Sequence, residues 1–326
     1  MKNQAFTTSF GLRNRHVQTL FSSFFRKIKT PQVEIEVFEL EDGDFLECYW
    51  LDKPKNREAK AIVILFHGLA GSFQSPYIQG AMNALQKENI PSVVMHFRGC
   101  SGKPNRLAKS YHSGETLDAK AWIHHVHTTF PQAKLFAVGY SLGANMLLKL
   151  LGEEGERTLL SGAVCVSPPM QLEVSATQMD RGFAKFYQYI LLRDLKRLLL
   201  QKYEHHDIKS LIGLDKNEVK KLSNFWEFDA AYTAPIHGFG SAQEYYEKSS
   251  AKQYLIHIRI PTYIIHAVDD PFMSEKILPT REELSPNITL QVSKNGGHVG
   301  FIAGNLREPQ YWLEERILEY FKSFIE

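Results

Sequence analysis

Residues 136–150 read FAVGYSLGANMLLKL, an apolar run, a serine between two glycines, and then a leucine-rich run. The first run predicts a buried strand and the second a helix. The chain passes from one to the other through the pentapeptide GYSLG, where an ordinary turn would use Asn, Asp or Pro. The small residues on both sides of Ser141 raise the question of whether its hydroxyl is a nucleophile.

Short apolar runs that end in Gly, Ser or Asp recur along the chain. Their hydrophobicity is continuous rather than alternating, which marks strands covered on both faces, as in a parallel sheet. Helical patterns separate the first four runs, so the chain is expected to form an α/β fold with a mostly parallel, doubly wound sheet. The expected strands are 61–68, 92–99, 134–141, 162–168, 261–269 and 288–294.

The two ends of the chain carry different patterns. Residues 32–51 alternate on both sides of an acidic turn, which predicts an antiparallel hairpin at the N-terminal side of the sheet. An amphipathic pattern predicts a closing helix from about Pro309 to Phe324.

One interval interrupts the alternation of strands and helices. Residues 169–255 contain leucine-rich helical sequence and no strong strand. We therefore expect a single domain over residues 1–326, with 169–255 inserted as a helical cap above the sheet edge where ligands bind.

Composition narrows the class of protein. The 326-residue chain has a formal net charge of +2, which provides no strong basic field and argues against nucleic-acid binding. Three cysteines without CxxC spacing argue against a disulfide scaffold or a thiolate zinc site and indicate a reducing compartment. No apolar run reaches the roughly 18 residues that span a bilayer, and the first residues lack the apolar core of a signal peptide. A cytoplasmic protein is expected.

The predicted strand ends collect residues that can do chemistry. Sites in open parallel sheets form beyond the carboxyl ends of the strands, where the chain places Ser141, the pair Asp269 and Asp270, and His298, in that order. Two glycines before His298 allow its loop to return toward the serine, so we expect it to be the general base. Asp270, which precedes Pro271, is favoured as the acid that orients His298, with Asp269 as the alternative.

Two backbone amides are candidates for an oxyanion hole. The N–H of Leu142 would lie at a helix N-terminus, which favours negative charge. The loop FHGLAGS, residues 66–72, follows the first long parallel strand, and the N–H of Leu69 is expected to be the second donor.

Other polar residues are read as structural. Arg98 and the segment 111–115 lie in loops near the same sheet edge, where bracing the loops is favoured over binding a substrate head group. Several further histidines are read as surface or core residues: His124, His125, His127, His205 and His206.

The motifs HGLAGS, HFRGCSG, YHSGETLD, GYSLGANM, APIHGF, DDPF and GGHVGF together resemble the bacterial YheT-type α/β-hydrolases. These are related to eukaryotic α/β-hydrolase-domain proteins that cleave acylglycerols and phospholipids. The N-terminal LRNRHVQTL is similar too, so the resemblance covers nearly the whole chain. It implies an α/β-hydrolase fold, Ser141 as nucleophile, one aspartate of the pair, His298 as base, carboxylic-ester hydrolysis, and no metal or cofactor.

Residues 16–29 predict an amphipathic helix followed by basic residues. One interpretation is a helix docked on the body of the enzyme. The other is an interfacial helix that contacts an anionic membrane and guides a lipid-like ester inward. The apolar face consists of Val17, Leu20, Phe21, Phe24, Phe25 and Ile28.

The leading hypothesis is a serine carboxylesterase acting on a medium-chain or lipid-like acyl ester through an acyl-enzyme. An acyltransferase with the same triad and a non-catalytic binding protein are the alternatives. The partner is expected to be a small-molecule or lipid-like ester, and the oligomeric state is left open. Four aromatic residues of the cap are candidates to line the acyl site: Phe183, Phe186, Tyr187 and Phe239.

Overall fold

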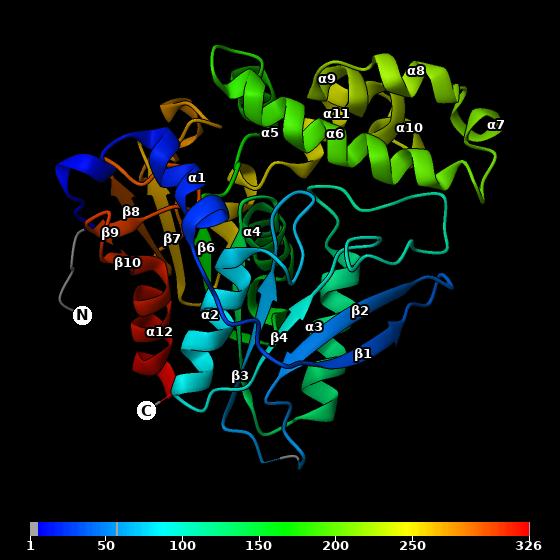
Figure 1. Ribbon diagram of the computed structural model, residues 1–326. Helices are drawn as coiled ribbons and strands as arrows, with labels where there is room; N and C mark the ends of the chain where they lie inside the picture. Colours follow the sequence, from blue (N-terminus) through cyan, green and yellow to red (C-terminus); the bar gives the residue numbers. More distant parts are fainter. Residues whose placement is uncertain (1–5, 57, 326) are drawn as a thin grey trace.

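An eight-stranded sheet forms the centre of the computed structural model, which describes residues 6–56 and 58–325 (Figure 1). The strand order is β1-β2-β4-β3-β5-β6-β7-β8. The pairs β1/β2 and β2/β4 are antiparallel and the others are parallel, which confirms the predicted sheet and its hairpin. The strands are β1 Glu34–Glu39, β2 Phe45–Leu51, β3 Ala61–Phe66, β4 Ser92–Met95, β5 Lys134–Tyr140, β6 Leu160–Val166, β7 Thr262–Ala267 and β8 Ile288–Ser293.

Helices cover both faces of this sheet (Figure 1). Every residue of β3 and β7 is buried, as continuous apolar strands require. One face packs on α3 (Leu117–Thr129) and α4 (Leu142–Glu154), and the other on α2 (Pro76–Lys87) and α12 (Trp312–Ile325). The sheet is therefore fixed by two apolar cores.

The chain between β6 and β7 is helical and lies over the carboxyl ends of the strands (Figure 1). We call residues 172–257 the helical segment. It has small apolar clusters of its own, one of which includes Leu192, Leu199, Ile208 and Phe228. Its elements are α5 Leu172–Met179, α6 Ala184–Lys202, α7 Ile208–Ile212, α8 Lys216–Lys221, α9 Phe225–Phe228, the π-helical η3 Asp229–Thr233, α10 Ala234–Ile236, α11 Ala242–Ser249 and the 3-10 turn η4 Lys252–His257.

Helix α1 (Arg15–Phe25) docks on the body of the protein through a buried amide. The side chain of Gln18 donates to the backbone oxygens of Leu12 and Ile302 and accepts from the N–H of Ile302. The helix is shorter than its predicted face, because it ends at Phe25 and leaves Ile28 in the following loop.

Two boundaries differ from the sequence expectation. The closing helix does not begin near Pro309, because Pro309–Tyr311 first pairs as β10 with β9 (Ile302–Gly304), a small hairpin that was not predicted. Strand β4 ends at Met95 rather than near residue 99. Beyond it, the N–H of Phe97 donates to a histidine side chain instead of to a neighbouring strand.

Within residues 6–56 and 58–325, no helix has both the length and the apolar character needed to cross a membrane.

Candidate active site

Ser141 sits in a sharp turn between β5 and α4. Its φ of 51° and ψ of −118° are strained for a residue with a side chain. A Cβ on Gly139 would lie 2.6 Å from the Cα of Ala144, and one on Gly143 would lie 2.5 Å from the backbone oxygen of His67. On both sides of the serine, the backbone therefore packs so closely on other backbone atoms that only glycine fits, which explains the GxSxG spacing.

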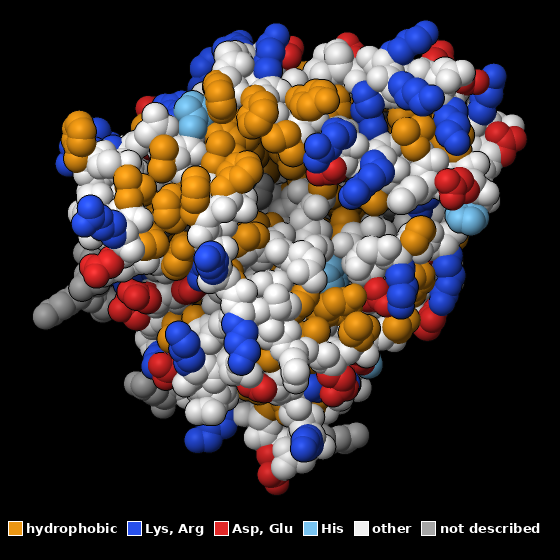
Figure 2. Space-filling model, in the orientation of Figure 1, with side chains coloured by type: hydrophobic (Ala, Val, Ile, Leu, Met, Phe, Trp, Pro, Cys, Tyr) orange, Lys and Arg blue, Asp and Glu red, His pale blue; other side chains and the backbone are white. Residues whose placement is uncertain are grey.

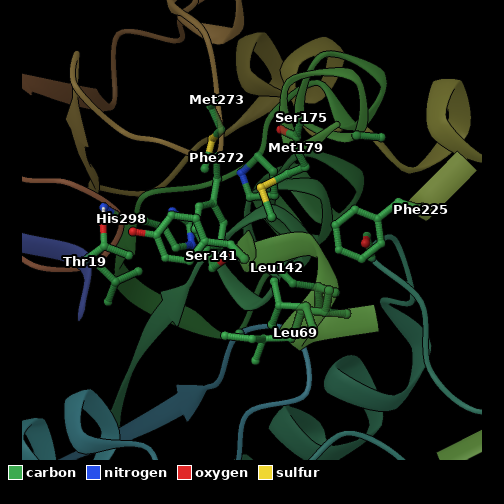
Figure 3. A pocket seen from close by; sticks show the side chains of 18 of the residues that line it. Thr19, Leu69, Ser141, Leu142, Ser175, Met179, Phe225, Phe272, Met273 and His298 are labelled. Atoms are coloured by element: carbon green, nitrogen blue, oxygen red, sulfur yellow. Dashed lines mark hydrogen bonds between the residues drawn. The ribbon is translucent and has the colours of Figure 1, made fainter. Parts of the chain in front are cut away.

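The serine hydroxyl lies at one end of a chain of hydrogen bonds, and Figure 3 shows Ser141 beside His298. Ser141 Oγ is 2.8 Å from His298 Nε2, and His298 Nδ1 is 2.8 Å from Asp270 Oδ2. This arrangement suits a neutral imidazole that donates to Asp270 and accepts from Ser141. The Asp270 side chain is buried, and its other oxygen accepts from the N–H of Phe272. The Phe272 ring stacks on the imidazole at 3.9 Å between centroids.

Asp269 has a different set of partners. Its Oδ1 accepts from the N–H of Gly297 at 2.9 Å, and its Oδ2 accepts from the side-chain amide of Asn295 at 3.3 Å. The structure thus places Asp270 against His298 and Asp269 against the loop that carries His298.

Three residues hold the His298 loop, and sequence reasoning gave none of them this role, although Ser167 was visible as a residue at a strand end. Thr19 of α1 accepts a hydrogen bond from the N–H of His298 through its hydroxyl at 3.0 Å, and the Ser167 hydroxyl accepts from the N–H of Val299 at 3.1 Å. A Cβ on Gly300 would overlap the backbone oxygen of Gln18. The motif LRNRHVQTL was the available signal, but nothing local ties it to a loop nearly 280 residues further on.

The two predicted oxyanion donors flank the serine. The N–H of Gly68 donates to the hydroxyl of Tyr77, and the N–H of Ala70 donates to that of Tyr111, which fixes the loop on both sides of Leu69. Within the described ranges, the N–H groups of Leu69 and Leu142 donate to no protein acceptor. Both residues line the cavity that contains Ser141 (Figure 3).

His67, beside this loop, braces it. Its Nδ1 lies 2.8 Å from the Gly68 oxygen and its Nε2 accepts from the N–H of Phe97. Burial lowers the pKa of His67 to about 3, so the ring stays neutral at physiological pH.

A largely apolar cavity of about 410 Å³ lies between the sheet edge and the helical segment, within the usual size range of small-molecule sites. Tyr187 lines it, but the other three aromatic candidates do not. Phe183 and Phe186 are exposed, and Phe239 packs on Tyr245. Helical periodicity reveals an apolar face but not what that face covers. Figure 3 labels six residues of the apolar lining: Leu69, Leu142, Met179, Phe225, Phe272 and Met273. The lining also includes Tyr77, Leu172, Tyr187, Ile190, Leu191 and Leu195.

The cavity wall also holds polar groups. Asp229, the first residue of the π-helical turn η3, lines it and accepts a hydrogen bond from the Tyr246 hydroxyl at 2.7 Å. Burial raises the pKa of Asp229 to about 6. Ser175 also lines the cavity, and its hydroxyl has no partner in the described part of the chain.

Arg98 does not face the cavity. It makes a two-pronged ion pair with Asp118 and also contacts Asp42 and Asp44. Burial alone would lower the pKa of Arg98, but the carboxylates of Asp118 and Asp42 raise it well above its usual value. Arg98 therefore ties the turn of the β1/β2 hairpin to α3, which agrees with the bracing role expected from the sequence.

His112, Glu115 and His237 form a half-buried group whose ligand atoms lie within 4.8 Å of one another. The N–H of Gly114 donates to His112 Nδ1, so the neutral ring carries its proton on Nε2, the atom 3.6 Å from Glu115. Burial and nearby positive charge, including that of Lys149, lower the pKa of His112 to about 2. With its proton on Nε2, the His112 ring directs no lone pair toward Glu115, which is typical of a packed histidine rather than a metal ligand.

The fold and the serine at its strand-to-helix turn define an α/β hydrolase. Residues 61–304 match the family described as alpha/beta hydrolase fold, and the chain belongs to this family. It is 42% identical to the Escherichia coli protein "Putative esterase YheT" over 97% of this chain and 92% of that protein, which confirms the resemblance seen in the sequence.

More distant comparisons agree. A monoacylglycerol lipase of Saccharomyces cerevisiae is 30% identical over 85% of this chain and 62% of its own length. The solved structure of the Pyrococcus furiosus esterase Pf2001 superposes with a TM-score of 0.59, covering 90% of this chain and 93% of that chain at 17% identity, which shows a shared fold. The chain is therefore an α/β hydrolase with relatives named as esterase and lipase.

Proposed function

We propose that this chain is a serine hydrolase that cleaves carboxylic esters through an acyl-enzyme formed on Ser141. The observation that carries the proposal is the pair of 2.8 Å contacts that link Ser141, His298 and Asp270 in series. A serine hydroxyl, a base and an acid that orients the base form the standard arrangement for activating a nucleophile.

The proposed reaction has two halves. The Ser141 oxygen attacks the ester carbonyl while His298 Nε2 takes the hydroxyl proton, and the N–H groups of Leu69 and Leu142 donate to the oxyanion. His298 then gives its proton to the leaving alcohol as the C–O bond breaks. A water molecule repeats the sequence on the acyl-enzyme and releases the carboxylic acid. Asp270 holds the imidazole in the productive tautomer throughout, and these steps use no metal or cofactor.

The cavity suggests the substrate class. Its apolar side chains suit a medium-chain or lipid-like acyl group, and the helical segment would act as a cap that encloses that group. The names of the relatives point in the same direction. We also propose a cytoplasmic location, because the three cysteines are buried and unpaired.

Labelling with a fluorophosphonate probe tests the nucleophile. The wild-type protein should be labelled, and Ser141→Ala should abolish labelling and lower kcat for p-nitrophenyl esters by about 10⁴- to 10⁶-fold. Ser175→Ala is the matched control, since Ser175 lines the same cavity without a base beside it, and it should keep the label. Labelling that persists in Ser141→Ala would contradict the proposal.

Product analysis separates hydrolysis from acyl transfer. If the enzyme is a hydrolase, the carboxylic acid should remain the main product when alcohols are added. The burst of p-nitrophenol should then be followed by a steady rate set by the attack of water on the acyl-enzyme. If alcohols divert most of the acyl-enzyme into a new ester, the chain is an acyltransferase with the same triad.

A further inference from the structure

Large aromatic side chains gather outside the cavity, where α1 meets α6. Phe24 and Phe25 of α1 and Phe183 and Phe186 beside or within α6 are between 45% and 70% exposed, and we call these four residues the aromatic rim. The two helices touch here, because the His16 ring lies 4.4 Å from that of Phe183 and its Nδ1 lies 3.0 Å from the Tyr187 hydroxyl. Phe24 also lines the cavity, so the rim borders its opening.

Positive charge is concentrated in the same two segments. Residues 10–29 contain five Lys or Arg and no Asp or Glu, and residues 181–202 contain six Lys or Arg and one Asp. The two segments together carry a formal charge of +10, and the remaining residues −8. Arg26 is largely buried against Glu314 and Lys202 is buried, so the other nine basic residues supply the positive charge of this surface. Such an asymmetry orients a protein toward an anionic surface.

The aromatic and basic residues share one exposed stripe of α6. Phe183, Phe186, Tyr189, Arg193 and Arg197 follow at intervals of three or four residues, the spacing of a single helix face. Further along this stripe lies a hollow between α6 and α8, which we call the basic groove. It is lined by Arg193, Lys196, Arg197, Lys216, Lys220 and Lys221, with Glu204 as its acid.

Figure 2 shows this face of the molecule. Hydrophobic side chains surround a hollow near the upper part of the view, and Lys and Arg side chains border them above and to the right. Apolar side chains at the centre with cations around them match the interface of a phospholipid bilayer, where aromatic rings enter the acyl boundary and cations lie at the phosphates.

We propose that the aromatic rim and the basic groove together dock the protein on an anionic phospholipid bilayer, with the cavity opening against the lipid. A lipid-like ester would then pass from the bilayer into the cavity without crossing water. Binding to the bilayer does not depend on the proposed function, but the entry of an ester substrate into the cavity does.

Vesicle co-sedimentation tests the docking. The protein carries Ser141→Ala so that lipid is not consumed, and the vesicles are phosphatidylcholine alone or mixed with phosphatidylglycerol. We expect binding to the anionic vesicles only, weakened by high salt. Phe25→Ser with Phe183→Ser and Phe186→Ser should reduce the partition coefficient on the order of tenfold or more. Arg197→Glu with Lys220→Glu should reduce it by at least about 25-fold, at about fivefold for each basic residue.

Matched controls lie elsewhere on the surface. Ile35→Ser with Val37→Ser removes exposed apolar side chains from the edge strand β1, and Lys55→Glu with Lys60→Glu makes the same charge change as the groove variant. Both should bind vesicles as the parent does. With Ser141 restored, every variant should hydrolyse p-nitrophenyl butyrate at the parental rate, which shows that it is folded.

The outcomes separate this proposal from its alternatives. If anionic vesicles are not bound, or the rim and groove variants bind as well as the controls, the docking is wrong. If light scattering shows a dimer that the three Phe→Ser changes dissociate, a second copy covers the rim and the docking is again wrong. If vesicles are bound as expected but no ester is hydrolysed, the docking stands and the proposed function fails.

Discussion

The turn at Ser141 and the helical segment meet at the same cavity but are built differently. At the turn, backbone packs on backbone, and a Cβ on Gly143 would lie 2.5 Å from a carbonyl oxygen. In the helical segment, Gly182 and Gly238 have positive φ angles, and a Cβ on either would have no other atom within 4 Å. Close packing at the turn fixes the position of Ser141. The helical segment has open space around these glycines, so larger side chains could be accommodated there. We therefore expect kcat to depend mainly on residues at the sheet edge, and the preference for acyl-chain length to depend mainly on residues of the helical segment.

The largest expected effect concerns the acid at the sheet edge. Asp270→Asn should lower kcat by about 10⁴-fold, because the amide favours the wrong tautomer of His298. Asp269→Asn should cost far less, since that side chain supports the loop through Gly297 and Asn295. Steady-state kinetics with a p-nitrophenyl ester measures both, and the opposite ranking would show that Asp269 orients the base.

The next effect tests the packing contrast directly. Gly143→Ala should destabilise the protein by about 3 kcal/mol, because the added methyl group meets the backbone of Phe66 and His67. Gly238→Ala, in the helical segment, should cost only about 1 kcal/mol, the strain of a positive φ in open space. Urea unfolding gives both free energies. If both variants lose the same free energy of unfolding, the two regions do not differ in how tightly their backbone is packed.

A third effect depends on pH. Burial raises the pKa of Asp229 from 3.8 to about 6, so the native state holds a proton that the unfolded chain releases between these values. The contribution of this residue to stability is therefore greatest below pH 4 and falls by at most about 3 kcal/mol as the pH rises to 6. The Asp229→Asn variant should lack this decline, so the difference in unfolding free energy between wild type and variant should fall as the pH rises from 4 to 6.

Asp215, in the same segment, is a control whose contribution to stability should change with pH in the opposite direction. Its carboxylate caps α8, and the hydrogen bond from the N–H of Asn217 and the contact with Lys209 lower its pKa. Stability from this group is present above the unfolded pKa and is lost as the pH falls, so Asp215→Asn should matter least in acid. If Asp229→Asn shows that same trend, Asp229 is not held in its protonated form by burial.

The smallest effect concerns acyl-chain preference. Phe225→Ala should shift the preferred p-nitrophenyl ester to a longer chain, because Phe225 lines the cavity and each covered methylene contributes about 0.8 kcal/mol. Phe239→Ala is the matched change, since Phe239 is also half-buried in the helical segment but packs on Tyr245. It should leave the chain-length profile of kcat/KM unchanged. A shift in Phe239→Ala alone would place the acyl site elsewhere.

Local patterns were sufficient for much of the fold. Unbroken apolar runs predicted the buried strands, because the side chains on both faces of a covered strand are buried and therefore apolar. Boundaries were less predictable: Pro309–Tyr311 pairs with a partner, β9, that no local pattern reveals. The glycines around Ser141 were visible in the sequence, but the backbone atoms that require them belong to α4, to the last residue of β3 and to His67 just after it.

The sequence by itself determined the sheet, the family, and the short set of residues from which a site could be built, because strand periodicity and glycine spacing are local properties. It favoured Asp270 over its neighbour without separating them, since adjacent carboxylates share one local pattern. Only the tertiary structure decided which of the two meets His298, that Thr19 supports the His298 loop, and that Phe183 and Phe186 lie outside the cavity beside α1. These are contacts between segments far apart in the chain, and such contacts are set by how the elements pack rather than by the spacing within any of them.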